Sequence, residues 1–141
     1  MSEINRFSGA YEFLSNFYPC KIIDEDEYEY SSVEAAFQAQ KTLSLEEKKK
    51  FTFLKDPSEA KSLGRRVSLR SDWEQIKDSV MEKFVRQKFS EPVLKDKLLS
   101  TGDAILIEGN YWKDYYWGVC KGVGKNKLGK ILMKIREELK S

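Results

Sequence analysis

Histidine is absent from the 141-residue sequence, and this absence excludes much of the common enzyme chemistry. Ser-His-Asp and Cys-His catalysis, a histidine general base and histidine-ligated zinc all need an imidazole. Cysteine is scarce too: Cys20 and Cys120 form no C-x-x-C pair, so neither a disulfide framework nor a zinc site is expected. Chemistry must therefore use carboxylates, amides, hydroxyls, lysines, arginines or aromatic rings, and we expect no cofactor and no metal.

Long apolar runs are also lacking, since no segment approaches the roughly 20 apolar residues that a membrane-spanning helix requires. The N-terminus lacks the layout of a signal peptide, so a cytoplasmic location without a membrane partner is expected. The sequence also lacks a large excess of charge of one sign. Its 25 basic residues nearly balance its 23 acidic ones, so the net charge indicates no particular partner. The length fits one domain, predicted over residues 1–141, and no obligate protein partner is inferred.

Helix start signals dominate the sequence after about the first 30 residues, which have the pattern of turns and short strands. A capping residue followed three positions later by glutamate predicts a helix start at four places: Ser31-x-x-Glu34, Ser44-x-x-Glu47, Asp56-Pro-x-Glu59 and Ser71-x-x-Glu74. A short helix should stop near Gly102, Ala104–Glu108 is a short strand, and Asn126 caps a last helix. These elements predict an α+β fold, a single helix-dominated domain with a small β-sheet.

The glycine-rich run Trp117–Gly129 resembles a phosphate-binding loop but fails as a Walker motif. Gly118 and Gly124 are separated by five residues instead of four, and Asn126 stands where a magnesium-binding Ser or Thr is required. Glycines and free amides before a helix N-terminus, near Lys125, still suit a phosphate. An ordinary flexible connection explains the run equally well.

The tryptophans allow two interpretations. Core filling is the usual fate of a tryptophan, but Trp73 stands at a predicted helix start, where an indole can stack on a flat heterocycle and contribute about 1–3 kcal/mol. Aromatic residues near lysines, as in "YWKDYYWG" at 111–118, would also suit single-stranded nucleic acid. A non-catalytic module that binds nucleic acid or an ADP-ribose-like ligand is therefore an alternative to an enzyme.

The acidic residue of the first predicted helix has two competing interpretations. Glu34, Gln38 and Lys41 line one face, and a polar face of this kind most often meets solvent. Glu34 also has a structural role in the predicted capping box, so periodicity alone favours a cap over a catalytic carboxylate. Glu108 ends the apolar run "AILI", where a pocket-edge carboxylate and a surface residue fit equally well.

Taken in order, the motifs of this chain resemble the NADAR family, a group that includes YbiA-like N-glycosidases of early riboflavin-pathway intermediates. The matching segments are "FLSNFYPC" (13–20), "SVEAAFQAQK" (32–41), "AKSLGRRV" (60–67), "LRSDWEQIKDSVM" (69–81), "KF" (88–89), "LLSTGDAILIE" (98–108), "YYWG" (115–118) and "GKNKLGKILMKIR" (124–136). The family also resembles ADP-ribose-handling proteins, including members that remove ADP-ribose from a nucleobase.

The resemblance implies a role for individual residues. It assigns the active-site glutamate to Glu34, as base or electrostatic stabiliser, and places Trp73 against the heterocycle. It implies the substrate-binding residues Asn16, Arg65, Trp117, Gly118, Lys125 and Asn126. Among these, Arg65, Lys125 and the amides before Asn126 would engage the phosphate.

Two departures from the family pattern are visible. Many relatives carry histidine after the glutamate, where this chain has Ala35, which implies that the histidine is dispensable or tunes substrate choice. Relatives often place an acid after YWG, where Val119 and Cys120 stand, so a loop carboxylate is not expected to contribute.

The reaction that the resemblance implies needs no imidazole. Cleaving a ribosyl C1–N bond develops oxocarbenium charge, and one carboxylate can either stabilise that cation or orient and deprotonate a water beside it. The implied substrate is a phosphoribosylamino-pyrimidine of riboflavin biosynthesis, cleaved to ribose 5-phosphate. The alternative is a guanine or other nucleobase carrying ADP-ribose, either as a small ADP-ribosyl molecule or within an ADP-ribosylated nucleic acid.

Overall fold

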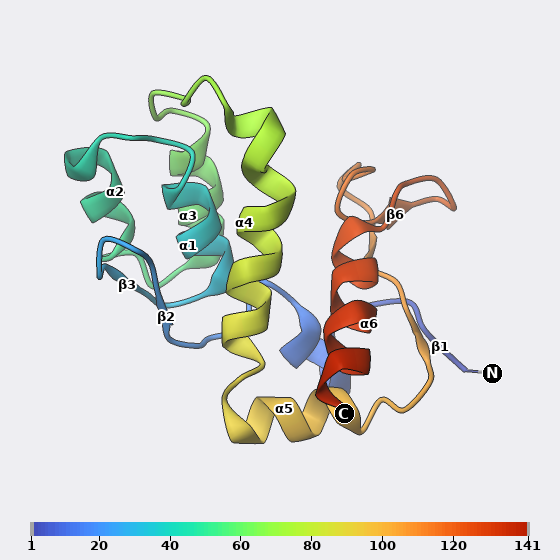
Figure 1. Cartoon of the computed structure of the whole chain (residues 1–141). Helices are drawn as coiled ribbons and strands as arrows, with labels where there is room; N and C mark the ends of the chain where they lie inside the picture. Colours follow the sequence, from blue (N-terminus) through green and yellow to red (C-terminus); the bar gives the residue numbers. More distant parts are fainter. Residues whose placement is uncertain (1, 141) are drawn as a thin grey trace. The chain divides into compact units, whose positions relative to one another are not determined.

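The structure, a computed structural model, describes residues 2–140, and these form two compact units (Figure 1). The central unit is Asn16–Lys88, and the terminal unit joins the residues up to Ser15 to those from Phe89 onward. Each unit has its own buried side chains, such as Tyr30 in the central unit and Leu132 in the terminal unit. The single domain predicted over residues 1–141 stays a prediction.

The central unit surrounds one short helix with three others. Its elements are β2 (Ile22–Ile23), β3 (Glu29–Tyr30), α1 (Val33–Ala39), α2 (Leu45–Phe51), α3 (Pro57–Gly64) and α4 (Trp73–Lys88). Helix α1 packs against α2, α3 and α4, and all seven of its residues are buried (Figure 1). The antiparallel pair β2–β3 sets Ile22 opposite Tyr30. Because α1 is buried on every side, its polar residues lie inside the unit instead of on its surface.

Side-chain caps explain where the helices of this unit begin. The hydroxyl of Ser44 accepts from the Glu47 N–H, and the carboxylate of Asp56 accepts from the Ser58 N–H, so both predicted starts are confirmed. The start predicted at Ser31 is wrong by one residue, because the Ser32 hydroxyl accepts from the Ala35 N–H at 3.1 Å.

Helix α4 begins slightly later than its sequence signal indicates. The predicted cap was Ser71, whereas the helix begins at Trp73 and the Asp72 carbonyl accepts from the N–H groups of Gln75 and Ile76. A bidentate ion pair between Arg70 and Asp72 precedes this turn, and it lowers the pKa of the Asp72 carboxyl. The helix predicted to start here is confirmed, with its first residue placed by backbone and ionic contacts.

The terminal unit combines two helices with short strand pairs. Its elements are β1 (Glu3–Ile4), a 3-10 helix (Gly9–Leu14), α5 (Pro92–Leu99), β4 (Ile105–Leu106), β5 (Gly109–Asn110), β6 (Val119–Cys120) and α6 (Lys127–Leu139). The pairs β1–β4 and β5–β6 are parallel, and α6 packs against β4 and α5. The apolar stripe of α6 is buried at Leu128, Ile131, Leu132 and Ile135.

The α+β class with dominant helices is confirmed. The strands of the described residues form three two-stranded sheets. The strand predicted over Ala104–Glu108 is shorter in the structure, where it spans Ile105–Leu106. Within residues 2–140, no helix combines the length and apolarity needed to cross a bilayer.

Candidate active site

Glu34 lies in the first turn of α1 with a buried carboxylate, as only 9% of the residue is exposed. Its Oε2 accepts a hydrogen bond from the side-chain Nε2 of Gln38 at 2.6 Å, and its backbone N–H donates to the Asn16 carbonyl. The expectation that this polar face meets solvent is wrong, because α1 is enclosed by other helices. The capping hydroxyl belongs to Ser32, so Glu34 has a carboxylate directed along the helix toward Gln38.

The Gln38 amide fits against Gly64 at the end of α3. An added Cβ on Gly64 would stand 2.0 Å from Oε1 of Gln38, so a larger residue cannot share this space with the amide. That Oε1 is buried and has no hydrogen-bond partner among the described residues. Sequence reasoning placed Gln38 on the face of Glu34 but gave it no role, although the i, i+4 spacing signals such a contact.

Basic side chains gather around Lys41, just beyond the C-terminal end of α1. Burial lowers the pKa of Lys41, the nearby Glu34 carboxylate acts in the opposite direction, and the positive charges of Arg65, Lys61 and Lys77 lower it further. The structure therefore brings the predicted Arg65 within electrostatic reach of the same lysine as Glu34. Lys41 itself was not predicted as a site residue, although its i+7 spacing from Glu34 pointed to it.

Trp73 and Asn16 complete the predicted residues of the central unit. The Trp73 ring lies 5.0 Å from the ring of Phe37 on α1, and the residue is 5% exposed. Asn16 donates its side-chain Nδ2 to the Met81 sulfur at 3.4 Å, while its carbonyl accepts from Glu34. Both residues are thus packed against the helix that carries Glu34. Their contacts with a substrate stay predictions.

In the terminal unit, Asn126 bridges α6 to the end of β4. Its Oδ1 accepts from the Glu108 N–H at 3.0 Å, and its Nδ2 donates to the Leu106 carbonyl at 2.9 Å. Asn126 precedes α6 as predicted, but its φ of 52° is left-handed and its side chain makes no cap hydrogen bond. The side-chain cap is therefore a wrong prediction, because the amide is directed to β4 instead.

Four backbone amides around the start of α6 are occupied. The N–H groups of Lys125, Asn126, Lys127 and Leu128 donate to the carbonyls of Tyr115, Gly118, Tyr116 and Trp117, respectively. Of the amides before Asn126, which were expected to engage a phosphate, that of Lys125 is therefore not free. The 115–118 segment lies against the start of α6 and takes the place that an anion would need.

Gly118 is a point of close packing. A Cβ there would lie 1.8 Å from Oε2 of Glu108 and 2.2 Å from the Glu108 carbonyl oxygen, and the Asn110 amide donates to the same Oε2 at 3.0 Å. A carboxylate thus lies beside the YWG segment, although none directly follows it in the sequence: it comes from Glu108, two residues after β4. Sequence spacing could not have paired Glu108 with Gly118, which is ten positions away.

Trp117 and Lys125 lie around one tyrosine. The rings of Trp117 and Tyr116 meet edge to face with centroids 4.9 Å apart, while Nζ of Lys125 lies 5.4 Å and Nζ of Lys127 lies 5.7 Å from the Tyr116 centroid. The backbone N–H of Trp117 donates to the Asp114 carboxylate at 2.9 Å. These predicted binding residues thus have structural partners within the unit, and their substrate contacts stay predictions.

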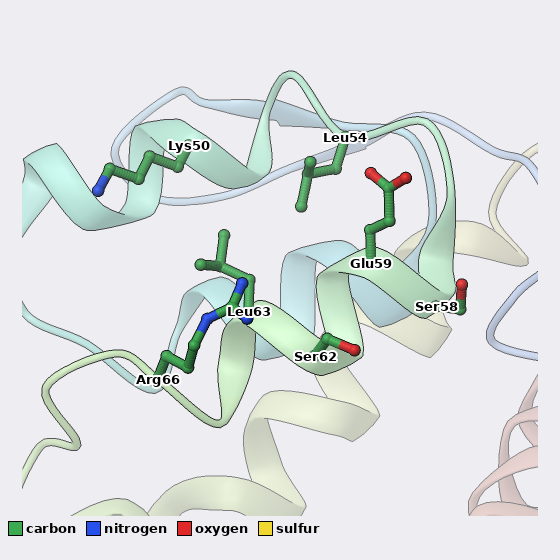
Figure 2. Close-up of a pocket in the computed structure, with 7 residues that line it drawn as sticks. All are labelled: Lys50, Leu54, Ser58, Glu59, Ser62, Leu63 and Arg66. Carbon is green, nitrogen blue, oxygen red and sulfur yellow. The ribbon is translucent and has the colours of Figure 1, made fainter.

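A cleft of about 460 Å³ lies between α2 and α3 and the residues that directly follow them (Figure 2). Its lining residues are Lys50, Leu54, Ser58, Glu59, Ser62, Leu63 and Arg66. None of the predicted site residues is in this set, and its side chains are mostly half-exposed or exposed. The predicted catalytic carboxylate, Glu34, therefore does not line this cleft.

Both thiols are free, and burial raises the pKa of Cys20. Within the described residues, no group of three or more His, Cys, Asp or Glu side chains is arranged to hold a metal ion.

Comparisons with known proteins match almost the whole chain. The model of the NADAR domain matches residues 5–140. The N-glycosidase YbiA of Escherichia coli is 38% identical over 138 residues, covering 94% of this chain and 84% of the relative. A riboflavin biosynthesis protein of Vibrio vulnificus is 40% identical over 131 residues, which are 90% of this chain but 35% of that longer relative.

A solved structure agrees with these sequence matches. The NMR structure of the E. coli protein YbiA has a TM-score of 0.86 and 36% identity, covering 99% of this chain and 85% of the other. Because the family model and a relative of similar length both span nearly all residues, the chain belongs to the NADAR domain family.

Proposed function

We propose that this chain is an N-glycosidase that hydrolyses the C1–N bond of phosphoribosylamino-pyrimidine intermediates of riboflavin biosynthesis. The observation that carries the proposal is the buried Glu34 carboxylate, which is hydrogen-bonded by Gln38 and lies near the cations around Lys41. The names of the relatives, N-glycosidase and riboflavin biosynthesis protein, support this reaction and substrate class.

The proposed chemistry uses Glu34 in two ways. As the C1–N bond breaks, its electron pair goes to the nitrogen of the pyrimidine, and the ionised carboxylate of Glu34 stabilises the cationic sugar. A water then forms the C1–O bond and gives one proton to Glu34. The nitrogen that leaves takes up a proton from solvent, and Glu34 releases its proton to solvent, so the carboxylate is restored. The products are ribose 5-phosphate and an aminopyrimidine. A hydrogen bond from Gln38 to the carboxylate favours the ionised form that both roles need.

The basic group around Lys41 suits the substrate phosphate. Mutual repulsion among Lys41, Lys61 and Arg65 contributes to the lowered pKa of Lys41, and a bound phosphate dianion would relieve that repulsion. Because Lys61 lies in α3 and Arg65 directly follows it, we assign the phosphate to the C-terminal end of α3. The amides at the start of α6 are not part of this proposal, since carbonyls of their own unit occupy them.

Trp73 is proposed to lie against the pyrimidine, and Asn16 to support the first turn of α1. The Trp73 ring packs on Phe37, three residues after Glu34, so the indole lies against the helix that carries the carboxylate. Trp117, Gly118, Lys125 and Asn126 are kept as proposed binding residues on family resemblance alone. A phosphorylated sugar made by metabolism would place the reaction in the cytoplasm.

A second candidate is hydrolysis of ADP-ribose from a modified nucleobase, including one within a nucleic acid. One observation favours it: Tyr111, Trp112 and Tyr115 are 84%, 49% and 45% exposed, and Lys113 lies among them. Exposed rings beside a lysine suit stacking with bases. A module that binds such ligands without turnover is the remaining alternative.

One set of incubations tests these functions. The protein is incubated separately with a phosphoribosylamino-pyrimidine and with an ADP-ribosylated guanine nucleotide, and the released reducing sugar is measured. We expect release from the first substrate, and Glu34→Gln should lower it at least about 100-fold while the fold is kept, as loss of a general base does. Release from the second substrate alone would favour the second candidate, and binding without release from either would contradict the enzyme.

A further inference from the structure

We infer that Gln38 is a positioning residue for Glu34 and that Gly64 is required because it leaves room for the Gln38 amide. The inference rests on the proposed function, since it concerns the carboxylate placed there as base. Two observations carry it. Nε2 of Gln38 donates a hydrogen bond to Oε2 of Glu34, and Oε1 of the same amide occupies the space that a Cβ on residue 64 would need. Each link lies within the central unit.

The first link is the bond between Gln38 and Glu34. The donor Nε2 and the acceptor Oε2 are 2.6 Å apart, which is short for an N–H···O bond and typical of a carboxylate acceptor. Both residues are buried, with 9% of Glu34 and 6% of Gln38 exposed, so water competes little with this donor. The bond therefore fixes the position of one carboxylate oxygen of Glu34.

The second link explains the glycine. Gly64 is the last residue of α3 and has no left-handed φ, so its backbone conformation is one that any L-amino acid adopts. Its Cβ would nevertheless stand 2.0 Å from Oε1 and 2.8 Å from Cδ of Gln38. The space, and not the backbone, requires glycine. A side chain at this position would push the amide away from its present place.

The third observation is the cost of this arrangement. Oε1 of Gln38 is buried without a hydrogen-bond partner among the described residues, which lowers stability. An apolar side chain of the same shape would avoid this loss. Turning the amide over would exchange the positions of Oε1 and Nε2. Oε1 of Gln38 would then face Oε2 of Glu34, and both of these oxygens are acceptors. The arrangement is thus explained by what Nε2 does for the carboxylate.

The charged groups near this carboxylate define what the amide adds. Lys41, just beyond the end of α1, interacts with Glu34. Lys61 of α3, Arg65 directly after α3 and Lys77 of α4 act in turn on Lys41. These cations suit a phosphate. A neutral amide orients the carboxylate without adding a further positive charge, so Glu34 keeps the basicity that proton transfer from water requires.

The test compares four variants with the wild type: Gln38→Met, Gly64→Ala, Gln38→Ala and the double variant of Gln38→Ala with Gly64→Ala. Gln38→Met keeps the volume and removes the donor. We expect its kcat to fall about ten- to a hundredfold, as loss of a hydrogen bond to a charged group does, with a much smaller change in KM. The acidic limb of its pH–rate profile should move to higher pH. Ser62→Ala, an exposed change on the same α3, is the matched control and should leave kcat unchanged.

Gly64→Ala should reproduce the kcat loss with the amide still in the chain. It should also lower the urea midpoint of unfolding, although alanine is the better helix former. In the Gln38→Ala background, where only the Cβ contact of 3.2 Å remains, the same change should no longer lower the midpoint. This double-mutant comparison needs no activity, so it tests the Gly64 contact even if Gln38→Met fails to fold.

The outcomes separate the two proposals. A wild type that releases no sugar overturns the proposed function. An active wild type with an unchanged kcat and pH profile in Gln38→Met overturns the positioning role alone. If Gly64→Ala lowers the urea midpoint equally with and without the Gln38 side chain, the role given to Gly64 is wrong.

Discussion

The indole of Trp73 lies 5.0 Å from the Phe37 ring at an interplanar angle of 56°. This contact joins the first turn of α4 to the middle of α1, and Glu34 lies one turn before Phe37 on the same helix. Tilted aromatic pairs of this kind stabilise the fold by more than the burial of their apolar area alone. Trp73 therefore has a structural role in holding α1, whether or not it also contacts the substrate.

Substitutions at Trp73 should separate the two roles. We expect Trp73→Ala to lower the free energy of unfolding by about 3–5 kcal/mol, because a large buried side chain is lost. Trp73→Phe keeps a ring beside Phe37 and should lose less, yet it should raise KM if the indole lies on the heterocycle. Urea unfolding and initial rates measure the two effects. Trp112→Ala, at a residue 49% exposed, is the control and should change stability little. A fully stable Trp73→Ala would contradict the structural role.

Local signals in the sequence predicted the helices better than the site. The caps at Ser44 and Asp56 depend on residues within one turn, and both were found as predicted. The burial of Glu34 depends on helices distant in sequence, so periodicity along α1 could not reveal it. It was the family resemblance that identified this residue as more than a cap.

The terminal unit shows the same limit for loops. Glycines before a helix suggested free amides at its start. In the structure, the carbonyls of residues 115–118 accept from the amides of residues 125–128, and only folding brings these two segments together. The left-handed conformation and β4 contacts of Asn126 likewise depend on residues 18 and 20 positions away. A local pattern describes what a segment can do, whereas packing decides which groups are already used.

Asn126 should prove important for stability. Asn126→Ala removes the acceptor of the Glu108 N–H and the donor to the Leu106 carbonyl, and it puts alanine at a φ of 52°. We expect a loss of about 3 kcal/mol, from two hydrogen bonds and left-handed strain. Asn126→Gly tolerates the backbone and should lose about 1 kcal/mol less. Urea unfolding checks both, and a stable Asn126→Ala that only raises KM would assign the amide to the substrate instead.

Gly118 should tolerate no side chain. In Gly118→Ala the new Cβ would meet the Glu108 carboxylate and carbonyl at 1.8 and 2.2 Å, so backbone must move, and we expect a loss above about 2 kcal/mol. Gly102→Ala is the control, because no atom lies within 4 Å of its Cβ and its φ of 62° costs only about 1–2 kcal/mol. Thermal unfolding of both variants makes the comparison. Equal losses would show that close packing at Gly118 is unimportant.

Asp24 provides a pH-dependent prediction in the central unit. Burial raises the pKa of its carboxyl, but hydrogen bonds from Tyr30, Gln40 and the Tyr28 and Asp26 backbones outweigh burial and bring it below its ordinary value of 3.8. The Tyr30 hydroxyl donates at 2.6 Å and the Gln40 amide at 3.0 Å. Because the folded pKa is below the unfolded one, the charged carboxylate stabilises the fold above about pH 4. That contribution is lost as the pH falls through the folded pKa.

We therefore expect Asp24→Asn to lower the free energy of unfolding by about 2–3 kcal/mol near pH 7, where it removes a buried charged acceptor. The gap from the wild type should narrow as the pH falls below 3.8, since the wild-type carboxyl then becomes neutral too. Urea unfolding at pH 7, 5, 4 and 3 measures this gap. Asp103→Asn is the control, because the pKa of Asp103 is also lowered, by Lys140, but its side chain is 92% exposed. Solvent screens a surface pair of this kind, so Asp103→Asn should change stability little. A gap for Asp24→Asn that stays constant with pH, or that equals the control, would refute the buried network.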